Sequence, residues 1–189
     1  MEVWDILDKE GNPTGKTVQR KKVCLMRGEY HMVVHIWILG SDGRVLIQRR
    51  SLNKPLMPGE WAAIGGSAVS GEDAPTAARR ELLEEMGVNA NPEDLKLIRK
   101  MVRNNSILYI YLVCCDIAIQ DLKLQEDEVA EAKWVHRNKL RQMIKAKEFH
   151  NYGNDYFDAV FGAFDRRSAL RRRRKRYERR HKKQTMSNM

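Results

Sequence analysis

The sequence predicts a single α/β domain followed by a basic tail, and three observations support this prediction. The chain has 189 residues, enough for one well-buried domain and too few for two independent cores. Strand-like apolar segments lie on both sides of one strongly helical segment, Glu72 to Met86. Basic residues then gather at the end of the chain. We therefore expect a domain at residues 1–165 and a tail at residues 166–189.

The expected strands are short apolar segments bounded by turn-forming residues. The Asp42-Gly43 pair predicts a tight hairpin between two of them. The polar stretch from Lys16 to Met26 is interpreted as helical. The expected strands cover residues 3–7, 32–39, 44–48, 61–64, 95–103, 107–117 and 132–135.

Three further helices are expected. The segment from Glu72 to Met86 has Pro75 in its first turn and Gly87 as a stop signal. A short helix is expected at residues 139–144. Phe157, Val160, Phe161 and Phe164 follow helical spacing, which predicts an apolar helix face that packs on the domain. Beyond residue 164 we expect either a solvated helix or disorder.

The net charge of +10 comes from the tail. Between Arg166 and Lys183 there are twelve Lys or Arg and one acid, Glu178. Removing these from the totals of 35 basic and 25 acidic residues leaves 23 and 24, so the rest carries about one negative charge. RNA or another polyanion is therefore an expected partner of the tail and not of the domain.

The apolar segments and the cysteines bear on the compartment. The longest apolar run, Ile107 to Cys115, has nine residues, too few to span a bilayer. Met1 to Asp5 lacks the features of a secretory signal. Three cysteines, an odd number, favour reduced, buried thiols over disulfides. A cytoplasmic protein without a transmembrane segment is expected.

The chemistry-bearing residues lie between Gly65 and Val88. Glu81, Glu84 and Glu85 are spaced so that three carboxylates share one face of the predicted helix, which we expect to be exposed. The repulsion between these three carboxylates would vanish if they bound a hard divalent cation. The alternative to a cation site is a solvated acidic helix face. Such a face would not require Glu72 ahead of the helix or Arg80 beside the first carboxylate.

These residues resemble the Nudix hydrolase signature. That signature reads Gly, five residues, Glu, seven residues, Arg-Glu, an aliphatic residue, any residue, Glu-Glu, any residue, Gly and an aliphatic residue. Gly66 to Val88 matches at all nine defined positions over 23 residues. The resemblance implies an α/β/α sandwich around a mixed sheet. It also implies Mg²⁺- or Mn²⁺-dependent cleavage of a pyrophosphate linkage in a small nucleotide-like diphosphate substrate.

The resemblance also implies roles for single residues. Glu84 and Glu85 would be the main metal ligands, completed by Glu81 and the Gly66 carbonyl. Arg80 would orient Glu81 and Glu84, and Glu72 would brace the loop. The general base is left open among Glu81, Glu128 and Glu131, and the candidate substrate contacts are Arg49, Arg50, Gly65 and Gly66.

A second resemblance is to the isopentenyl-diphosphate isomerase branch of the superfamily. It is carried by residues 3–12, 31–35, 48–51 and 58–61. The isomerase's catalytic Cys element corresponds here to Ile64-Gly65-Gly66-Ser67, which contains neither Cys nor His. Hydrolysis is therefore favoured over isomerisation. An RNA 5′-end pyrophosphohydrolase, a catalytically inert binding module and a homodimeric assembly stay open.

Overall fold

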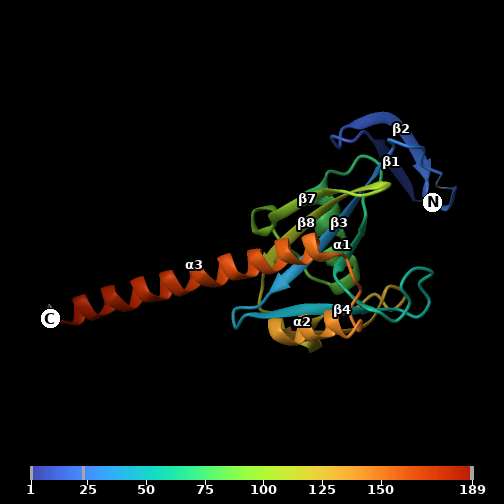
Figure 1. The fold of residues 1–189 in the computed structure, drawn as a ribbon. Coiled ribbons are helices and arrows are strands. Elements are labelled where there is room, and N and C mark those ends of the chain that lie inside the picture. Colours follow the sequence, from blue (N-terminus) through green and yellow to red (C-terminus); the bar gives the residue numbers. More distant parts are fainter. Residues whose placement is uncertain (1, 23, 188–189) are drawn as a thin grey trace. The chain divides into compact units, whose positions relative to one another are not determined.

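The structure is a computed structural model that describes residues 2–22 and 24–187. The chain divides into two compact units, residues 1–151 and residues 152–189. Strands dominate the first unit (Figure 1). They are β1 (Val3–Leu7), β2 (Pro13–Gln19), β3 (His31–Leu39), β4 (Arg44–Arg50), β5 (Trp61–Ala62), β6 (Ile64–Ser67), β7 (Lys96–Val102), β8 (Ser106–Cys114) and β9 (Val129–His136).

The central sheet of the first unit is mixed. Its strand order is β5-β4-β3-β8-β7, with β6 pairing β3 and β9 pairing β4. The strands β3 and β8 run parallel from the pair His31 and Ser106 to the pair Leu39 and Cys114, and the other pairings are antiparallel. The strands β1 and β2 form a separate hairpin. The predicted α/β fold around a mixed sheet is confirmed.

The helices are α1 (Ala74–Met86), α2 (Arg137–Lys145) and α3 (Asn154–Ser187), with short 3₁₀ turns at Arg20–Lys22, Pro92–Asp94 and Ile119–Asp121. The best-defined ends belong to α1. The Asp73 side chain accepts a hydrogen bond from the Thr76 amide at 2.9 Å and caps the helix start. At the other end Gly87 adopts φ 70°, a left-handed conformation that favours glycine. Its amide donates a hydrogen bond to the Leu83 carbonyl.

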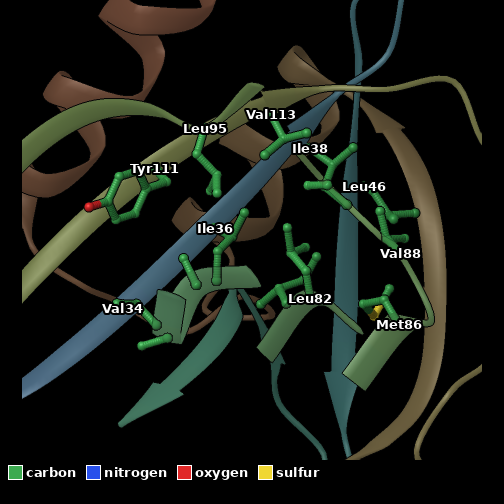
Figure 2. Close-up of a cluster of buried hydrophobic side chains, with 14 of the residues drawn as sticks. Val34, Ile36, Ile38, Leu46, Leu82, Met86, Val88, Leu95, Tyr111 and Val113 are labelled. Atoms are coloured by element: carbon green, nitrogen blue, oxygen red, sulfur yellow. The ribbon is translucent and has the colours of Figure 1, made fainter. Parts of the chain in front are cut away.

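The core holds α1 against the sheet (Figure 2). Leu82 and Met86 on α1 pack with Val34, Ile36 and Ile38 of β3, and all five side chains are fully buried. Successive strand residues face opposite sides of a sheet. Trp37 therefore lies on the other face, where it stacks on Phe149 just beyond α2 at 5.9 Å. Both faces of the sheet are thus covered.

Two expectations about the first unit are wrong. The segment from Lys16 to Met26 was expected to be helical, but residues up to Gln19 belong to β2, and residue 23 lies outside the described residues. This strand is exposed along most of its length, so it lacks the alternating pattern that marks a half-buried strand. The cysteines are free, as expected, yet Cys24 and Cys114 are exposed and not buried.

The second unit is dominated by α3. Its Phe157, Val160, Phe161 and Phe164 are buried, and neighbouring phenyl rings along this face lie about 6 Å apart, at 6.4 and 5.9 Å. Packing of this face on the domain stays a prediction. The helix passes without a break through residues 165 and 166, so the helical alternative for the tail holds. Among the described residues, no helix has the length and apolar character needed to cross a membrane.

Candidate active site

Gly65 and Gly66 let the backbone of β6 touch the carboxylates of α1. A Cβ atom on Gly66 would lie 2.5 Å from Oε1 of Glu81 and 2.8 Å from its Oε2, so any side chain there would displace the carboxylate. Gly65 has φ 142°, and a Cβ there would lie 2.0 Å from the carbonyl oxygen of Val34. Its amide donates to Oε2 of Glu85 at 3.2 Å. Only glycines allow this close approach.

Arg80 links the glutamates of the signature. Its Nε and Nη2 donate to the two carboxylate oxygens of Glu72 at 2.8 and 3.0 Å. Its Nη1 donates to Glu81 at 2.9 Å and to Glu84 at 3.0 Å, and its Nη2 also donates to the Ser67 carbonyl at 3.1 Å. These five bonds match the five N–H donors of a guanidinium. Arg80 thus contacts both Glu81 and Glu84, and its role in orienting them for catalysis stays a prediction.

Glu72 also contacts the loop that it was expected to brace. Its Oε2 accepts a hydrogen bond from the Val69 amide at 2.9 Å. Because the same carboxylate accepts two bonds from Arg80, it connects the loop before α1 with the middle of the helix.

The expectation of an exposed glutamate face on α1 is wrong. Glu84 is exposed, but Glu81 and Glu85 keep only 9% and 3% of their accessible surface, because this side of the helix lies against β6. Burial raises the pKa of Glu81 to about 7, and the Arg80 guanidinium offsets part of the shift. Burial, followed by the nearby Glu81 charge, raises the pKa of Glu85 to about 8.

Glu128 joins this cluster from the start of β9. Its charge contributes to the raised pKa values of both Glu81 and Glu85. Nζ of Lys54 lies 2.5 Å from both Glu128 carboxylate oxygens, and the Ser51 amide donates to its carbonyl at 2.9 Å. The sequence alone offered no signal for Lys54, because its partner is 74 residues away.

Glu131 lies on β9 and Arg49 on β4. Both are exposed, and they face each other in register on β9 and β4. Nε of Arg49 donates to the Gly59 carbonyl at 2.9 Å, so this side chain braces the loop between β4 and β5.

Of the two arginines among the candidate substrate contacts, Arg50 acts electrostatically on the cluster. Its Nε donates to the Leu56 carbonyl at 3.0 Å, and its positive charge offsets part of the raised pKa of Glu85. Burial, followed by the charges of Arg103, His150 and Arg50, lowers the pKa of His35 to about 3. His35 is therefore neutral near neutral pH and pairs with Gly65 across β3 and β6.

The donor set fits a hard divalent cation by its chemistry. The pKa values of Glu81 and Glu85 stay raised although Arg80 pairs with Glu81, so a further positive charge would stabilise both carboxylates. Carboxylate and carbonyl oxygens are the ligands that Mg²⁺ prefers. Within residues 2–22 and 24–187, no three acidic, imidazole or thiol groups already converge as a metal cage. Arg80 holds Glu81 and Glu84 through hydrogen bonds. These two carboxylates must therefore turn away from Arg80 before they can bind a cation.

Comparisons with known proteins agree with this geometry. The sequence profile of the NUDIX domain matches residues 29–157. The chain is 33% identical over 153 residues to an uncharacterised Nudix hydrolase of Listeria monocytogenes, covering 80% of this chain and 90% of the relative. It is 30% identical to isopentenyl-diphosphate Delta-isomerase 2 of Photorhabdus laumondii, covering 76% and 82%. The crystal structure of DR0079 from Deinococcus radiodurans superposes with a TM-score of 0.65 at 23% identity, covering 77% and 90%.

Proposed function

Because this chain belongs to the Nudix hydrolase family and is a pyrophosphohydrolase, we propose that it cleaves the pyrophosphate linkage of a nucleoside-diphosphate-type substrate with Mg²⁺ or Mn²⁺. One observation carries this proposal: buried Glu81 and Glu85 lie directly on the backbone of Gly66 and Gly65, and Arg80 links Glu81 to Glu84. Burying two carboxylates so close together costs free energy that Arg80 offsets only in part at Glu81, and a bound cation or a proton recovers more of it.

The residues of the cluster have separate roles in this proposal. Glu84 and Glu85 are the main cation ligands, with Glu81 and the Gly66 carbonyl completing the set. A bound divalent cation supplies positive charge that stabilises the negative charge on the phosphates and lowers the pKa of water. Arg80 keeps the carboxylates oriented, and Arg50 binds a substrate phosphate beside Glu85. Arg49 is bonded to the loop between β4 and β5 through the Gly59 carbonyl.

Glu128 is our choice for the general base. It acts electrostatically on both buried glutamates, and Lys54 holds its carboxylate in one place. A carboxylate at this position accepts the proton of the attacking water, and its negative charge favours the protonated product. Glu131 is exposed and paired in register with Arg49, which gives it a weaker claim.

The test is a substrate screen followed by a matched pair of variants. Purified protein is incubated with nucleoside diphosphate derivatives and dinucleoside polyphosphates in Mg²⁺, and the products are separated by chromatography. We expect hydrolysis that excess EDTA abolishes. Glu128→Gln should lower kcat by about 10²- to 10⁴-fold, whereas Glu131→Gln should stay within twofold of wild type. Turnover in EDTA would refute the metal assignment, and the reverse order of the two variants would move the base to Glu131.

Isomerisation is a second candidate function, favoured by the similarity to the Photorhabdus isomerase. The segment Ile64-Gly65-Gly66-Ser67 lacks the Cys that this resemblance requires, and Gly65 leaves no room for a side chain beside Val34. We therefore expect no conversion of isopentenyl diphosphate by the protein that hydrolyses a nucleotide substrate. Conversion at a comparable rate would reverse the ranking of the two functions.

RNA 5′-end hydrolysis is a third candidate, favoured by the cations that α3 carries beyond residue 165. Cations along a helix attract phosphates without regard to sequence. The same screen includes a 5′-triphosphorylated RNA oligomer, whose cleavage at low salt and not at high salt would support this candidate.

A further inference from the structure

The basic segment of α3 is a helix surface that the glutamate cluster does not use. The helix runs through this segment without a break (Figure 1). Twelve of the eighteen residues from Arg166 to Lys183 are Lys or Arg, and Glu178 is the one acid among them. Within this segment the structure describes the side chains of residues 166–174 and 177. The arginines among them are Arg166, Arg167, Arg171, Arg172, Arg173 and Arg174, and all but Arg171 are exposed.

These six arginines are spread around the helix and do not share one face. At about 100° per residue, with Arg166 at 0°, the other five lie at about 100°, 140°, 240°, 340° and 80°. An arginine position therefore occurs in every arc of the helix wider than about 100°. Like charges three and four residues apart also repel each other along the helix. A partner with negative charge on more than one side would relieve that repulsion.

One narrow apolar stripe interrupts the cations. Leu170 and Tyr177 are seven residues apart and lie at about 40° and 20° on the same scale, between the positions of Arg166 and Arg174. Their side chains are well exposed, at 57% and 63%. Cations thus border a stripe of about 80° on both sides. A matching partner offers an uncharged surface to the stripe and negative charge to its two flanks.

A flat anionic membrane matches this surface poorly. A helix that lies in a lipid interface buries a broad apolar face, whereas this stripe holds two apolar residues. Arg172, at about 240°, lies almost opposite the stripe, so it would be about 10–12 Å from the lipid, one helix diameter. That distance exceeds the Debye length of about 8 Å at physiological salt. The membrane would therefore attract the far side of the helix only weakly.

A groove between two rows of phosphates matches it better. The major groove of B-form DNA is about 12 Å wide and admits an α-helix, which is about 10–12 Å across with its side chains. Phosphates border this groove on both sides, and its floor offers base edges and thymine methyl groups. The major groove of double-stranded RNA is deep and narrow, so side chains cannot read it. Single strands are held largely by stacking on aromatic side chains, and Tyr177 is the one Phe, Tyr or Trp in residues 166–183.

We propose that residues 166–177 of α3 are a docking surface for the major groove of double-stranded DNA. Arginines on the two flanks contact phosphates of both strands, and Leu170 and Tyr177 face the floor of the groove. Because phosphate contacts carry no sequence information, binding depends only weakly on DNA sequence. The docking surface is independent of the glutamate cluster, so it does not rest on any substrate proposed for hydrolysis.

The experiment measures fluorescence anisotropy of the full-length protein in EDTA with four probes. These are a 20-base-pair DNA duplex, one of its strands, an RNA duplex of the same sequence and vesicles that contain phosphatidylserine. For duplex DNA at 0.1 M salt we expect a dissociation constant on the order of 1 µM, and a slope of log affinity against log salt of about −5. The single strand and the RNA duplex should bind at least about tenfold more weakly. The protein should displace a major-groove dye from the DNA and not a minor-groove dye.

Three variants locate the binding surface. Arg172→Gln should weaken duplex binding by about fivefold and flatten the salt slope by about one. Lys145→Gln is the matched control, because it removes one exposed cation from α2 and should leave binding unchanged. Leu170→Ala should weaken duplex binding by about threefold with an unchanged salt slope, because it removes apolar surface and no charge.

The contrary outcomes are equally specific. Tighter binding of the RNA duplex or of the single strand, or displacement of the minor-groove dye alone, would overturn the groove assignment. Preference for vesicles over DNA would assign the surface to a membrane. An equal loss in Lys145→Gln and Arg172→Gln would mean that net charge and not this helix governs binding. Unchanged affinity in Leu170→Ala would contradict the placement of the apolar stripe on the groove floor.

Discussion

Residues 65–87 and residues 166–187 use charge in opposite ways. In the first region, Arg80 donates five hydrogen bonds to groups from three parts of the chain. In the second, Arg166, Arg172 and Arg173 are exposed on α3 among cations of the same sign. An arginine inside a hydrogen-bond network fixes the positions of its partner groups. A row of exposed arginines instead creates a positive electrostatic potential around the helix.

Within residues 65–87, we expect substitution of Glu85 to have the largest effect on activity. Glu85→Gln removes a buried charge without changing volume, and we expect kcat to fall by at least about 10³-fold because a cation ligand is lost. Folding should survive, since the amide avoids the cost of a buried carboxylate. Steady-state kinetics at saturating Mg²⁺ and circular dichroism measure the two effects. Activity within a few-fold of wild type would refute the role of Glu85.

Replacing the network's centre should cost stability as well as activity. Arg80→Lys keeps the charge but cannot donate five bonds in the planar guanidinium geometry. We expect the free energy of unfolding to fall by about 2 kcal/mol, measured by urea denaturation. Arg79→Lys is the matched control on the same helix, because Arg79 makes one side-chain bond, to the Ala90 carbonyl. Equal losses in both variants would contradict the special position of Arg80.

The raised pKa values of Glu81 and Glu85 predict a pH dependence of stability. Between about pH 6.5 and 8 the folded, cation-free protein holds protons on these groups, with pKa values of about 7 and 8, that the unfolded chain has already released. Stability therefore falls as pH rises through this window. The pKa values of His31 and His35 are lowered from 6.5. These two groups therefore change the pH dependence of stability mainly below about pH 6.5 and not in this window.

Thermal unfolding in EDTA from pH 6.5 to 8.5 tests this dependence. We expect Tm to fall over the window in wild type and to fall less in Glu85→Gln. Mg²⁺ should raise Tm more at pH 8 than at pH 6.5, because binding displaces protons. Glu131→Gln is the control for an exposed glutamate. A wild-type Tm that rises with pH would contradict the raised pKa values.

The smallest expected effect belongs to the second region. Truncation after Asp165 should leave hydrolysis of a small substrate within twofold of wild type, because the buried face of α3 ends at Phe164. Binding of a 5′-triphosphorylated oligomer should weaken, and the slope of log affinity against log salt should flatten. A large loss of small-substrate turnover would make the basic segment part of the structure of the site.

The catalytic segment was predictable to an unusual degree because its information is local. Helix spacing, Pro75 and Gly87 are enough to place α1, and the nine signature positions identify the family. Lys54 and Glu128 could not be paired in advance, since residues 74 positions apart meet only through the sheet. The strand β2 was missed for a related reason: it is held by pairing with β1 and not by an apolar pattern of its own.

The amino-acid sequence was sufficient for the fold class, the helix that carries the glutamates and the family, because each depends on spacing along one stretch of chain. Spacing also indicated that the three glutamates share a face. Whether that face met water or backbone depended on β6, whose glycines bring the chain close enough to bury Glu81 and Glu85. Burial and the pKa values that follow from it are properties of contacts between distant segments, so only the tertiary structure could decide them.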